Sequence, residues 1–513
     1  MDICGHILVA AATLASADQL SAQSPLANPH KAPLYWSVYE YCYTADGEIP
    51  ESVWEANIDW VESNLKPYGY NMVCIDGWGD DSPCTANGYR VKHARSWTHD
   101  YAWWSAELQR RGMTLGIYNN PLWIRGAATV SGAPATVVGT TIPVASLSLA
   151  SNPYYVDVRK PGAEQYVKGC IQYYADMGVK YLRVDFLSWY QLGNYNRGLA
   201  ASGGSRLPDS DYTTAIRWIK EACDANNMLF SLVMPNLDAE GAMERQHGHM
   251  MRVNSDCFDG GWVNFSSRDR GIRHPTWSQW SNAFDGYIYW SYVAGKKNMI
   301  LDGDFIRLNT FANDTERRTC ISLHLMAGGP LSVADQHNTI GSSLPLYQNP
   351  EMLALNADGF VGKPLSNNPA QASSQIWTGQ MSDSNWVVGL FNREDTLQTR
   401  TINFATQLGF ASGAVRDLWV RSDLGTMSSH SASIPARGCT VLEIVPSNPQ
   451  VLAPGSPRGQ APMVHGIFPA RRLPPSSQIR PAPPSVTPPT EAPRPRQRAT
   501  STAARSRCVP APH

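Results

Sequence analysis

Carboxylates recur in the first two thirds of this chain at the points where short apolar runs end. Asp76, Asp185 and Asp256 each close or closely follow such a run. Arg252 lies at the end of the same run as Asp256, and other runs end in the polar residues Tyr118, Asn119, Asp302, Asp304 and Asp335. If the runs are parallel strands whose ends meet at one mouth, like charges there push carboxyl pKa values apart. One ionised and one protonated carboxylate would suit the hydrolysis of a glycosidic bond. Metal binding is the competing use of such a cluster.

The elements that would position these residues follow a regular alternation. Helical periodicity marks Val53–Asn64, Tyr101–Arg111, Gly162–Met177 and Thr213–Ala225. The predicted strands are Leu34–Tyr39, Asn71–Asp76, Thr114–Tyr118, Lys180–Phe186, Met228–Met234, Met250–Asn254, Met299–Asp302 and Pro330–Ala334. Eight successive βα units predict an α/β protein with a (β/α)8 TIM barrel over residues 32–362. Its active site should lie at the carboxyl ends of the strands.

The chain changes character on both sides of this region. Short alternating strands over Asn385–Asn392 and Thr440–Val445 predict a separate β domain over residues 370–446. Residues 447–513 are rich in Pro and Arg and are predicted to be a disordered tail. Residues 1–22 contain a short apolar run, Ile7–Ala17, followed by small residues, which is typical of a signal peptide. We therefore expect a secreted or periplasmic protein without a membrane span.

Composition narrows the possible partners. The formal net charge of −1 gives no electrostatic case for binding nucleic acid or a membrane surface. The 17 Trp and 22 Tyr residues suit sugar-binding clefts, although core packing is their ordinary use. No cysteine spacing indicates structural zinc. His247 and His249 form a His-x-His pair, but it precedes the sixth predicted strand, at the wrong end of the barrel for a catalytic metal site.

A series of segments resembles, in order, the motifs of glycoside hydrolase family 27, the α-galactosidase-like enzymes. Tyr181–Asp185 is similar to the family's nucleophile strand, Tyr-Leu-Lys-x-Asp, and Arg252–Asp256 to its Arg-x-x-x-Asp acid/base segment. Leu301–Phe305 resembles its Asp-Pro-Asp-Met strand. Further matches are Glu316–Thr319, Pro330–Asp335, Glu351–Asp358 and Val415–Trp419, the last being typical of the family's C-terminal β-sandwich.

The resemblance implies a retaining double displacement that needs no metal or organic cofactor. It identifies Asp185 as the nucleophile and Asp256 as the general acid/base, with their carboxyl groups about 5–5.5 Å apart. The family commonly has a disulfide at the places of Cys42 and Cys84, so we expect that bond. A structural ion pair is the alternative role for Arg252. The expected substrate contacts are Trp36, Asp76, Trp78, Tyr118, Arg183, Arg252 and Asp304.

The sugar specificity is less clearly indicated. The family usually has two adjacent Asp residues after the second strand, which bind hydroxyls of galactose, whereas this chain has only Asp76, followed by Gly77 and Trp78. The family's dominant specificity favours an exo-acting α-galactosidase that acts on oligo- or polysaccharides. Isomalto-dextranase activity on α-1,6-glucan, β-L-arabinopyranosidase and α-N-acetylgalactosaminidase activities remain open. So does a non-catalytic carbohydrate-binding barrel, which would be expected to lose Asp185 or Asp256.

Overall fold

The computed structural model describes residues 28–76, 79, 83–124, 132–150, 154–192, 206–257, 259–274, 277–295 and 298–447. The predicted signal peptide, residues 1–22, lies outside these ranges, as does the predicted tail apart from Ser447. Among the described residues, no helix has the length and apolar character needed to cross a membrane.

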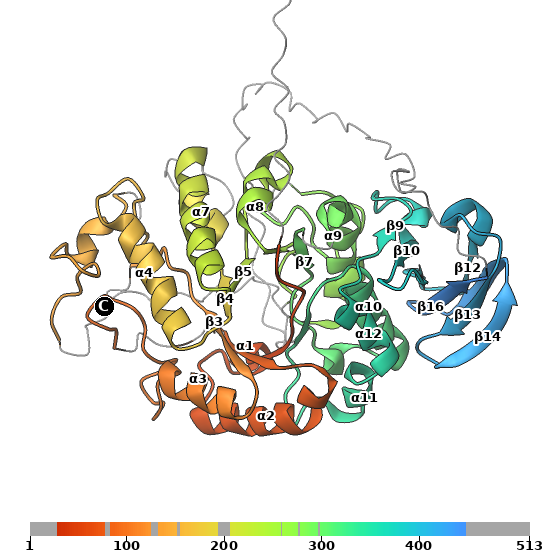
Figure 1. Cartoon of the computed structure of the whole chain (residues 1–513), viewed down its shortest axis with the longest axis horizontal. Coiled ribbons are helices and arrows are strands. Elements are labelled where there is room, and N and C mark those ends of the chain that lie inside the picture. Colours follow the sequence, from red (N-terminus) through yellow and green to blue (C-terminus); the bar gives the residue numbers. More distant parts are fainter. Residues whose placement is uncertain are drawn as a thin grey trace, which may run out of the picture.

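Eight parallel strands form the centre of the first domain and confirm the predicted barrel (Figure 1). They are β1 (Leu34–Ser37), β2 (Met72–Ile75), β3 (Thr114–Tyr118), β4 (Tyr181–Val184), β5 (Leu229–Leu232), β6 (Met250–Arg252), β7 (Ile300–Asp302) and β8 (Leu331–Val333). Neighbours follow in chain order, and β1 pairs with β8. The remaining seam is closed beyond the end of β7, where Ile306 forms a parallel bridge with Val333 of β8.

Helices surround the strands. Several begin at a capping side chain, such as Asp100, which accepts a hydrogen bond from Trp103 N, and Asn313, which accepts one from Glu316 N. Their bounds are α1 (Tyr39–Ala45), α2 (Glu51–Asn64), α3 (Tyr101–Arg110), α4 (Ala163–Asp176), α5 (Leu187–Leu192), α7 (Asp209–Ala225), α8 (Ala242–His247), α9 (Ala283–Trp290), α10 (Asp314–Met326), α11 (Leu344–Tyr347) and α12 (Pro350–Asp358).

Alternation along the strands decides which side chains reach the mouth. Tyr35, Cys74 and Tyr181 are buried together in one cluster inside the barrel, while their chain neighbours pack outward against the helices. Gly116 makes room for this interior, because a Cβ atom there would lie 2.8 Å from the Tyr181 ring. Arg183 lies two residues beyond Tyr181 on the same strand, so its side chain also points into the barrel.

The C-terminal domain consists of antiparallel strands and confirms the predicted sandwich. A six-stranded sheet has the order β14-β13-β16-β11-β10-β9, and β12 pairs with β15. The strands are β9 (Lys363–Pro364), β10 (Ile376–Gln380), β11 (Trp386–Phe391), β12 (Gln398–Asn403), β13 (Gly413–Asp417), β14 (Ser422–Met427), β15 (Ser429–Ile434) and β16 (Cys439–Pro446). The domain lies beside α10 and α12 (Figure 1).

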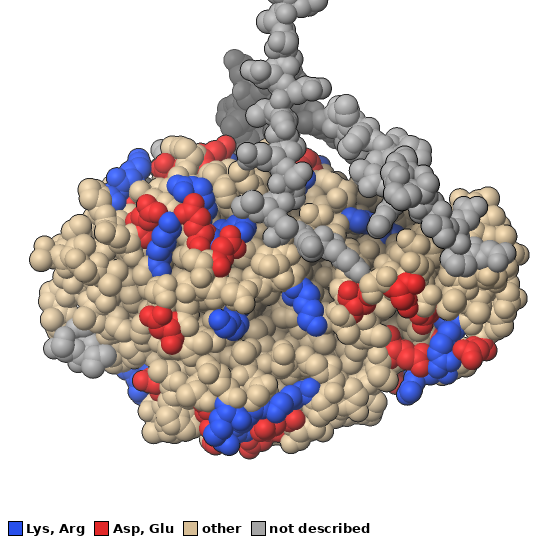
Figure 2. Space-filling model, in the orientation of Figure 1, with Lys and Arg blue, Asp and Glu red and all other residues tan. Residues whose placement is uncertain are grey.

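Polar contacts, one of them fully buried, join the two domains. The Arg393 guanidinium, from the loop after β11, lies 2.6 Å from Asp285 of α9, and both side chains are fully buried. Arg437 pairs with Glu316 of α10 at 2.8 Å. Elsewhere, charges of both signs are interspersed over the face shown in Figure 2, without a large patch of one sign. This distribution offers no broad basic surface on that face for a polyanion.

Candidate active site

The predicted polar residues meet at the carboxyl end of the barrel. Each comes from the inward face of a strand or from the segment directly after it, so that residues distant in sequence become neighbours. The residues brought together are Asp76, Tyr118, Arg183, Asp185, Arg252, Asp256 and Asp304. Trp78 lies outside the described residues.

Asp185 follows β4 and is held by three neighbouring groups. Its Oδ2 accepts a hydrogen bond from the Tyr118 hydroxyl at 3.1 Å, and its Oδ1 accepts one from Phe186 N at 2.6 Å. The side-chain amide of Asn120 donates to the Asp185 carbonyl oxygen at 2.7 Å. Phe186 has a left-handed backbone conformation, with φ of 62°. The turn after β4 is thus fixed so that the Asp185 carboxylate faces the mouth.

Burial raises the pKa of Asp185 to about 7, and the nearby charge of Asp256 adds to the increase. The positive charge of Arg183 and the hydrogen bond from Phe186 N act in the opposite direction. Burial and Asp185 together also raise the pKa of Tyr118, so its hydroxyl remains a donor at neutral pH. The substrate-free site therefore keeps a proton on or near Asp185 in mildly acidic solution.

Arg183 forms the floor of the mouth. Its guanidinium is 3% exposed and lies against three carboxylates: 3.6 Å from Asp76 Oδ2, 3.2 Å from Asp302 Oδ2 and 3.2 Å from Asp304 Oδ1. One face of the guanidinium also covers the Phe305 ring, with 4.4 Å between its central carbon and the ring centroid. Arg183 thus holds together the ends of β2, β4 and β7.

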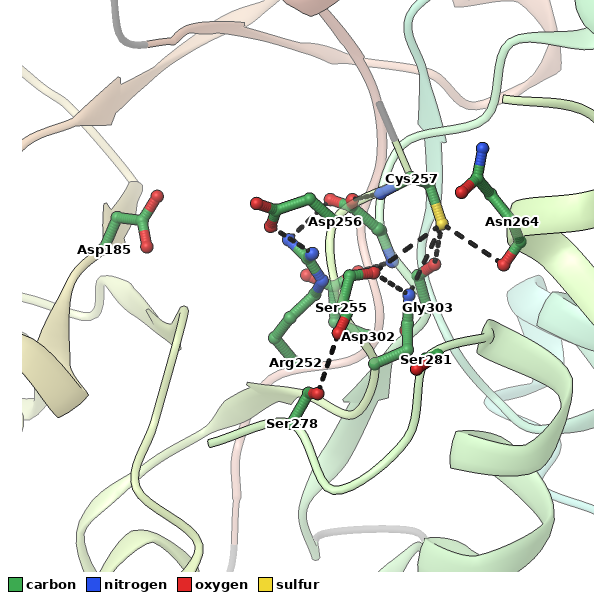
Figure 3. A network of polar contacts seen from close by, with 12 residues as sticks. Asp185, Arg252, Ser255, Asp256, Cys257, Asn264, Ser278, Ser281, Asp302 and Gly303 are labelled. Atoms are coloured by element: carbon green, nitrogen blue, oxygen red, sulfur yellow. Dashed lines mark hydrogen bonds and ion pairs between the residues drawn. The ribbon is translucent and has the colours of Figure 1, made fainter. Parts of the chain in front are cut away.

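Arg252, the last residue of β6, bridges two carboxylates. Its two terminal nitrogens lie 2.7 Å from Asp256 Oδ1 and 2.7 Å from Asp304 Oδ1. Figure 3 shows Arg252 and Asp256 on one side of the mouth, with Asp185 on the other side facing Asp256. Arg252 therefore forms an ion pair with Asp256, which was the alternative considered to a direct substrate contact.

Among the described residues, the mouth holds more negative than positive groups. Two guanidinium groups, those of Arg183 and Arg252, face the carboxylates of Asp76, Asp185, Asp256, Asp302 and Asp304. Burial raises the pKa of Asp304 to about 6, although both arginines lower it. A surplus of buried carboxylates favours the retention of protons in the mouth. Such an arrangement can supply an acid and a base to one bound molecule.

Trp36 does not belong to this group, and the geometry gives no support to a sugar contact there. The side chain is fully buried, its indole N–H donates to the Asp335 carbonyl at 2.9 Å, and its ring packs against Trp54 of α2. Strand alternation is the physical reason, since Tyr35 on the same strand points inward and Trp36 therefore points outward. Asp335 is likewise a structural residue, whose carboxylate accepts from Leu308 N and Asn309 N.

Sequence reasoning missed two residues at the start of α1. Tyr39 stacks on Phe305 at a centroid distance of 4.3 Å. Burial raises the pKa of Tyr39, and the nearby negative charges of Asp304 and Asp256 raise it further. Glu40 is 2% exposed, and it accepts hydrogen bonds from residues that follow β7 and β8: Arg307, Asn309, Gln336 and Thr339. Side chains alternate in direction along an extended chain. If this alternation continued past β1, Tyr39, four residues after Tyr35, would be expected to point inward.

Apolar side chains border the mouth beside Asp185. Phe186 and Trp189 lie 4.3 Å apart by ring centroid and are partly buried against Met234 and Trp277. The Arg252 guanidinium lies 5.7 Å from the Trp277 ring centroid, which connects this rim to the Asp256 cluster. Aromatic and apolar surface next to paired carboxylates suits the apolar faces of sugar rings.

The remaining predicted features lie away from the mouth. His249 is fully buried; its ring accepts from Phe230 N and lies 2.7 Å from Asp224, so the His-x-His pair has a structural member. Among the described residues, no group of three or more His, Cys, Asp or Glu side chains is arranged to hold a metal ion. Cys42 and Cys84 are both buried, but no disulfide between them is shown, and that bond stays a prediction.

Comparison with known proteins agrees with this geometry. Residues 371–444 match the model of the alpha galactosidase C-terminal beta sandwich domain. The chain is 41% identical over 436 residues to an isomalto-dextranase of Arthrobacter globiformis, a match that covers 81% of this chain and 67% of the relative. It is 30% identical over 139 residues to alpha-galactosidase 3 of Arabidopsis thaliana, covering 26% and 32% of the two chains.

A solved structure shows the same similarity in three dimensions. The isomalto-dextranase of Arthrobacter globiformis T6, complexed with panose, aligns with a TM-score of 0.76 and 39% identity over 82% of this chain and 73% of that one. The barrel, its mouth of carboxylates and the C-terminal sandwich define a glycoside hydrolase. Together with these similarities, they establish that the chain belongs to glycoside hydrolase family 27.

Proposed function

We propose that this protein is an isomalto-dextranase, a retaining enzyme that cleaves α-1,6-glucan. The observation that carries the proposal is the 41% identity to the Arthrobacter isomalto-dextranase, which extends over 81% of this chain. The similarity to the Arabidopsis alpha-galactosidase covers only 26% of the chain. The comparison therefore favours the alternative left open by the sequence over the α-galactosidase that the family's dominant specificity suggested.

The polar floor of the mouth gives independent support against galactose. The second carboxylate that the family usually carries after Asp76 is replaced by Gly77 in this sequence. Asp76 itself is 5% exposed and lies 3.6 Å from the Arg183 guanidinium, which also contacts Asp302 and Asp304. A site with this single, ion-paired carboxylate is poorly matched to a sugar held by two adjacent Asp side chains.

In the proposed first step, Asp185 attacks the anomeric carbon and Asp256 protonates the leaving oxygen. A glycosyl–Asp185 ester forms as the glycosidic bond breaks. Asp185 must be ionised for this step, and the hydrogen bonds from Tyr118 and Phe186 N favour its charged form. Positive charge that develops on the sugar ring in the transition state favours it further.

In the second step, Asp256 removes a proton from water, which attacks the anomeric carbon of the glycosyl ester and breaks its bond to the Asp185 oxygen, so that the Asp185 carboxylate leaves. Arg252 supports both steps, because its 2.7 Å contact with Asp256 Oδ1 holds that carboxyl group in place for the two proton transfers. The two inversions give overall retention at the anomeric carbon. The chain's own carboxylates suffice for this chemistry, and no cofactor is required by the proposal.

The test is a comparison of two substrates with two forms of the enzyme. The wild type is expected to release isomaltose from dextran and to leave an aryl α-galactoside unchanged. Asp185→Asn, which keeps the shape of the side chain but removes the nucleophile, should abolish the dextran activity. Wild-type turnover of the galactoside without turnover of dextran would replace the proposed substrate. Dextran activity that survives in Asp185→Asn would refute the nucleophile assignment.

We also propose that the enzyme acts outside the cytoplasm. The proposal rests on the apolar run Ile7–Ala17 and the small residues that follow it, and a polymeric glucan would be encountered outside the cell. N-terminal sequencing of protein recovered from the culture medium or periplasm is expected to start near residue 23. An intact Met1 on fully active cytoplasmic protein would contradict export.

A further inference from the structure

Asp304 was expected to contact the substrate, but both of its carboxylate oxygens contact groups of the protein itself. Its Oδ1 lies 2.7 Å from Arg252 and 3.2 Å from Arg183, and its Oδ2 accepts a hydrogen bond from Cys257 N at 2.8 Å. The residue is only 1% exposed. Since both oxygens are occupied by protein donors and hardly any surface is accessible, a sugar hydroxyl has little opportunity to bind there.

The backbone at Asp304 is shaped to direct the carboxylate towards the end of β6. Asp304 has φ of 77°, in the left-handed region that non-glycine residues seldom adopt. Its own N–H donates to Asp302 Oδ1 at 2.8 Å, which fixes the turn after β7. Strained conformations of this kind persist where surrounding contacts hold them, often at functional sites.

The side chain of Asp256, in contrast, has few contacts of its own. The residue follows β6 in a segment without regular structure, and its side chain is 33% exposed. Among the described residues, Arg252 is the one hydrogen-bond donor to its carboxylate. The backbone carbonyl of Asp256 accepts a hydrogen bond from Arg268 at 3.1 Å. The orientation of its carboxylate depends on Arg252, and the peptide that follows it is also held at Cys257 N; both of these groups contact Asp304.

We propose that Asp304 is a positioning residue that holds the acid/base Asp256 in its working orientation. It fixes one end of the Arg252 bridge, and it fixes the backbone amide directly after Asp256. This proposal rests on the acid/base role proposed above for Asp256. The role of Asp304 can be recognised from the leaving group of the substrate. Loss of Asp304 should strongly impair cleavage where the leaving group needs a proton, and should impair it far less where the leaving group needs none.

The first test is Asp304→Asn, assayed on dextran and on 4-nitrophenyl α-isomaltoside. The amide has nearly the same shape, but its NH2 edge must face either Arg252 or Cys257 N, both of which are donors. We expect kcat/KM, which reports the steps up to the glycosyl-enzyme, to fall about 100-fold on dextran and less than about 10-fold on the nitrophenyl glycoside. Equal losses on both substrates, or no loss, would overturn the proposal.

Asp302→Asn is the matched control. Asp302 is an equally buried carboxylate of the same strand end; it contacts Arg183 at 3.2 Å and the Asp304 amide, but it has no hydrogen bond to Arg252 or to Cys257. Asn keeps a side-chain oxygen that can accept the hydrogen bond from Asp304 N. The substitution should therefore change kcat/KM on both substrates by the same factor. A leaving-group dependence as large as that of Asp304→Asn would assign the effect to the general charge of the mouth and would contradict a specific role for Asp304.

A second variant covers the case in which Asp304→Asn does not fold. Arg252→Lys keeps the charge, but its single nitrogen cannot reproduce the two-nitrogen bridge between Asp256 and Asp304. The same selective loss on dextran is expected, and an unselective loss would contradict the proposal. If the wild type hydrolyses another α-glycoside instead of dextran, the proposed function fails, but the same comparison on that sugar still tests the role of Asp304.

Discussion

Two regions of this protein bury arginine–aspartate pairs, and they use them differently. At the domain interface, Arg393 faces the single carboxylate of Asp285, which also accepts from Gly271 N and Asn282. At the mouth of the barrel, two guanidinium groups face an excess of carboxylates. One cation for each anion stabilises the docking of two domains. An excess of anions instead leaves protons in the site, where the proposed reaction needs them.

The largest effect is expected at the acid/base. Asp256→Ala should lower kcat on dextran by about 10³-fold, because the leaving oxygen must then depart unprotonated. Azide, which can attack the glycosyl-enzyme without a general base, should restore turnover of an aryl α-isomaltoside and yield a glycosyl azide. Turnover of dextran at an unchanged rate would remove Asp256 from the mechanism.

Loss of the buried ion pair at the domain interface should lower the stability of the protein and leave the catalytic step unchanged. Arg393→Ala leaves Asp285 buried without its cation, and we expect a loss of about 3–5 kcal/mol in the free energy of unfolding. Its control is Arg270→Ala, which removes the neighbouring Arg270–Glu394 pair with both side chains about one third exposed. That pair should contribute about 0–1 kcal/mol. Thermal unfolding of both variants measures the difference, and similar losses in the two would contradict the contrast between buried and exposed pairs.

The acidic limb of the pH profile of kcat/KM should reflect the ionisation of Asp185. Its pKa is raised to about 7 in the free enzyme, and the nucleophile works only when ionised, so kcat/KM should rise with pH through about 7. Substitution of Tyr118 by Phe removes one hydrogen bond to the ionised form and should move this limb to higher pH. An acidic limb that stays in place in Tyr118→Phe would show that another group controls it.

A smaller effect is expected on stability, with the opposite dependence on pH. Between pH 3.8 and about 7 the folded state holds a proton on Asp185 that the unfolded chain releases, so the free energy of unfolding falls as pH rises through this window. Asn cannot ionise, so Asp185→Asn should not lose stability as pH rises. The substitution should raise Tm at pH 8 by roughly 2 °C, with little change at pH 4. An equal change in Tm at both pH values would indicate a packing effect.

The barrel could be predicted because apolar runs alternate with helical stretches, and because most of these runs end at or next to a polar residue. Asp76, Asp185 and Arg252 stood out as polar residues after apolar stretches, and the structure places all three at the mouth. Strand bounds were predicted a few residues too long, since the terminal residues leave the sheet to shape the mouth. Thr114–Tyr118, where the predicted and observed strands coincide, is an exception.

The errors arose where tertiary pairing decides the outcome. Trp36 was assigned to the substrate on family resemblance, although the alternation of its strand turns it towards α2. Glu40 was missed because its partners lie about 270 to 300 residues later in the chain. Asp304 was recognised as a site residue, but its bonds to Arg252 and Cys257 N depend on how β6 and β7 sit side by side.

Trapping of the covalent intermediate would identify the nucleophile itself. The enzyme would be incubated with a fluorinated α-glycosyl fluoride that forms the glycosyl-enzyme rapidly and hydrolyses slowly, then digested and mapped by mass spectrometry. We expect one added glycosyl group on the peptide that contains Asp185, absent in Asp185→Asn. A sugar attached to a different residue, or release of a β-configured first product without any labelled peptide, would contradict the assignment of Asp185 as the nucleophile.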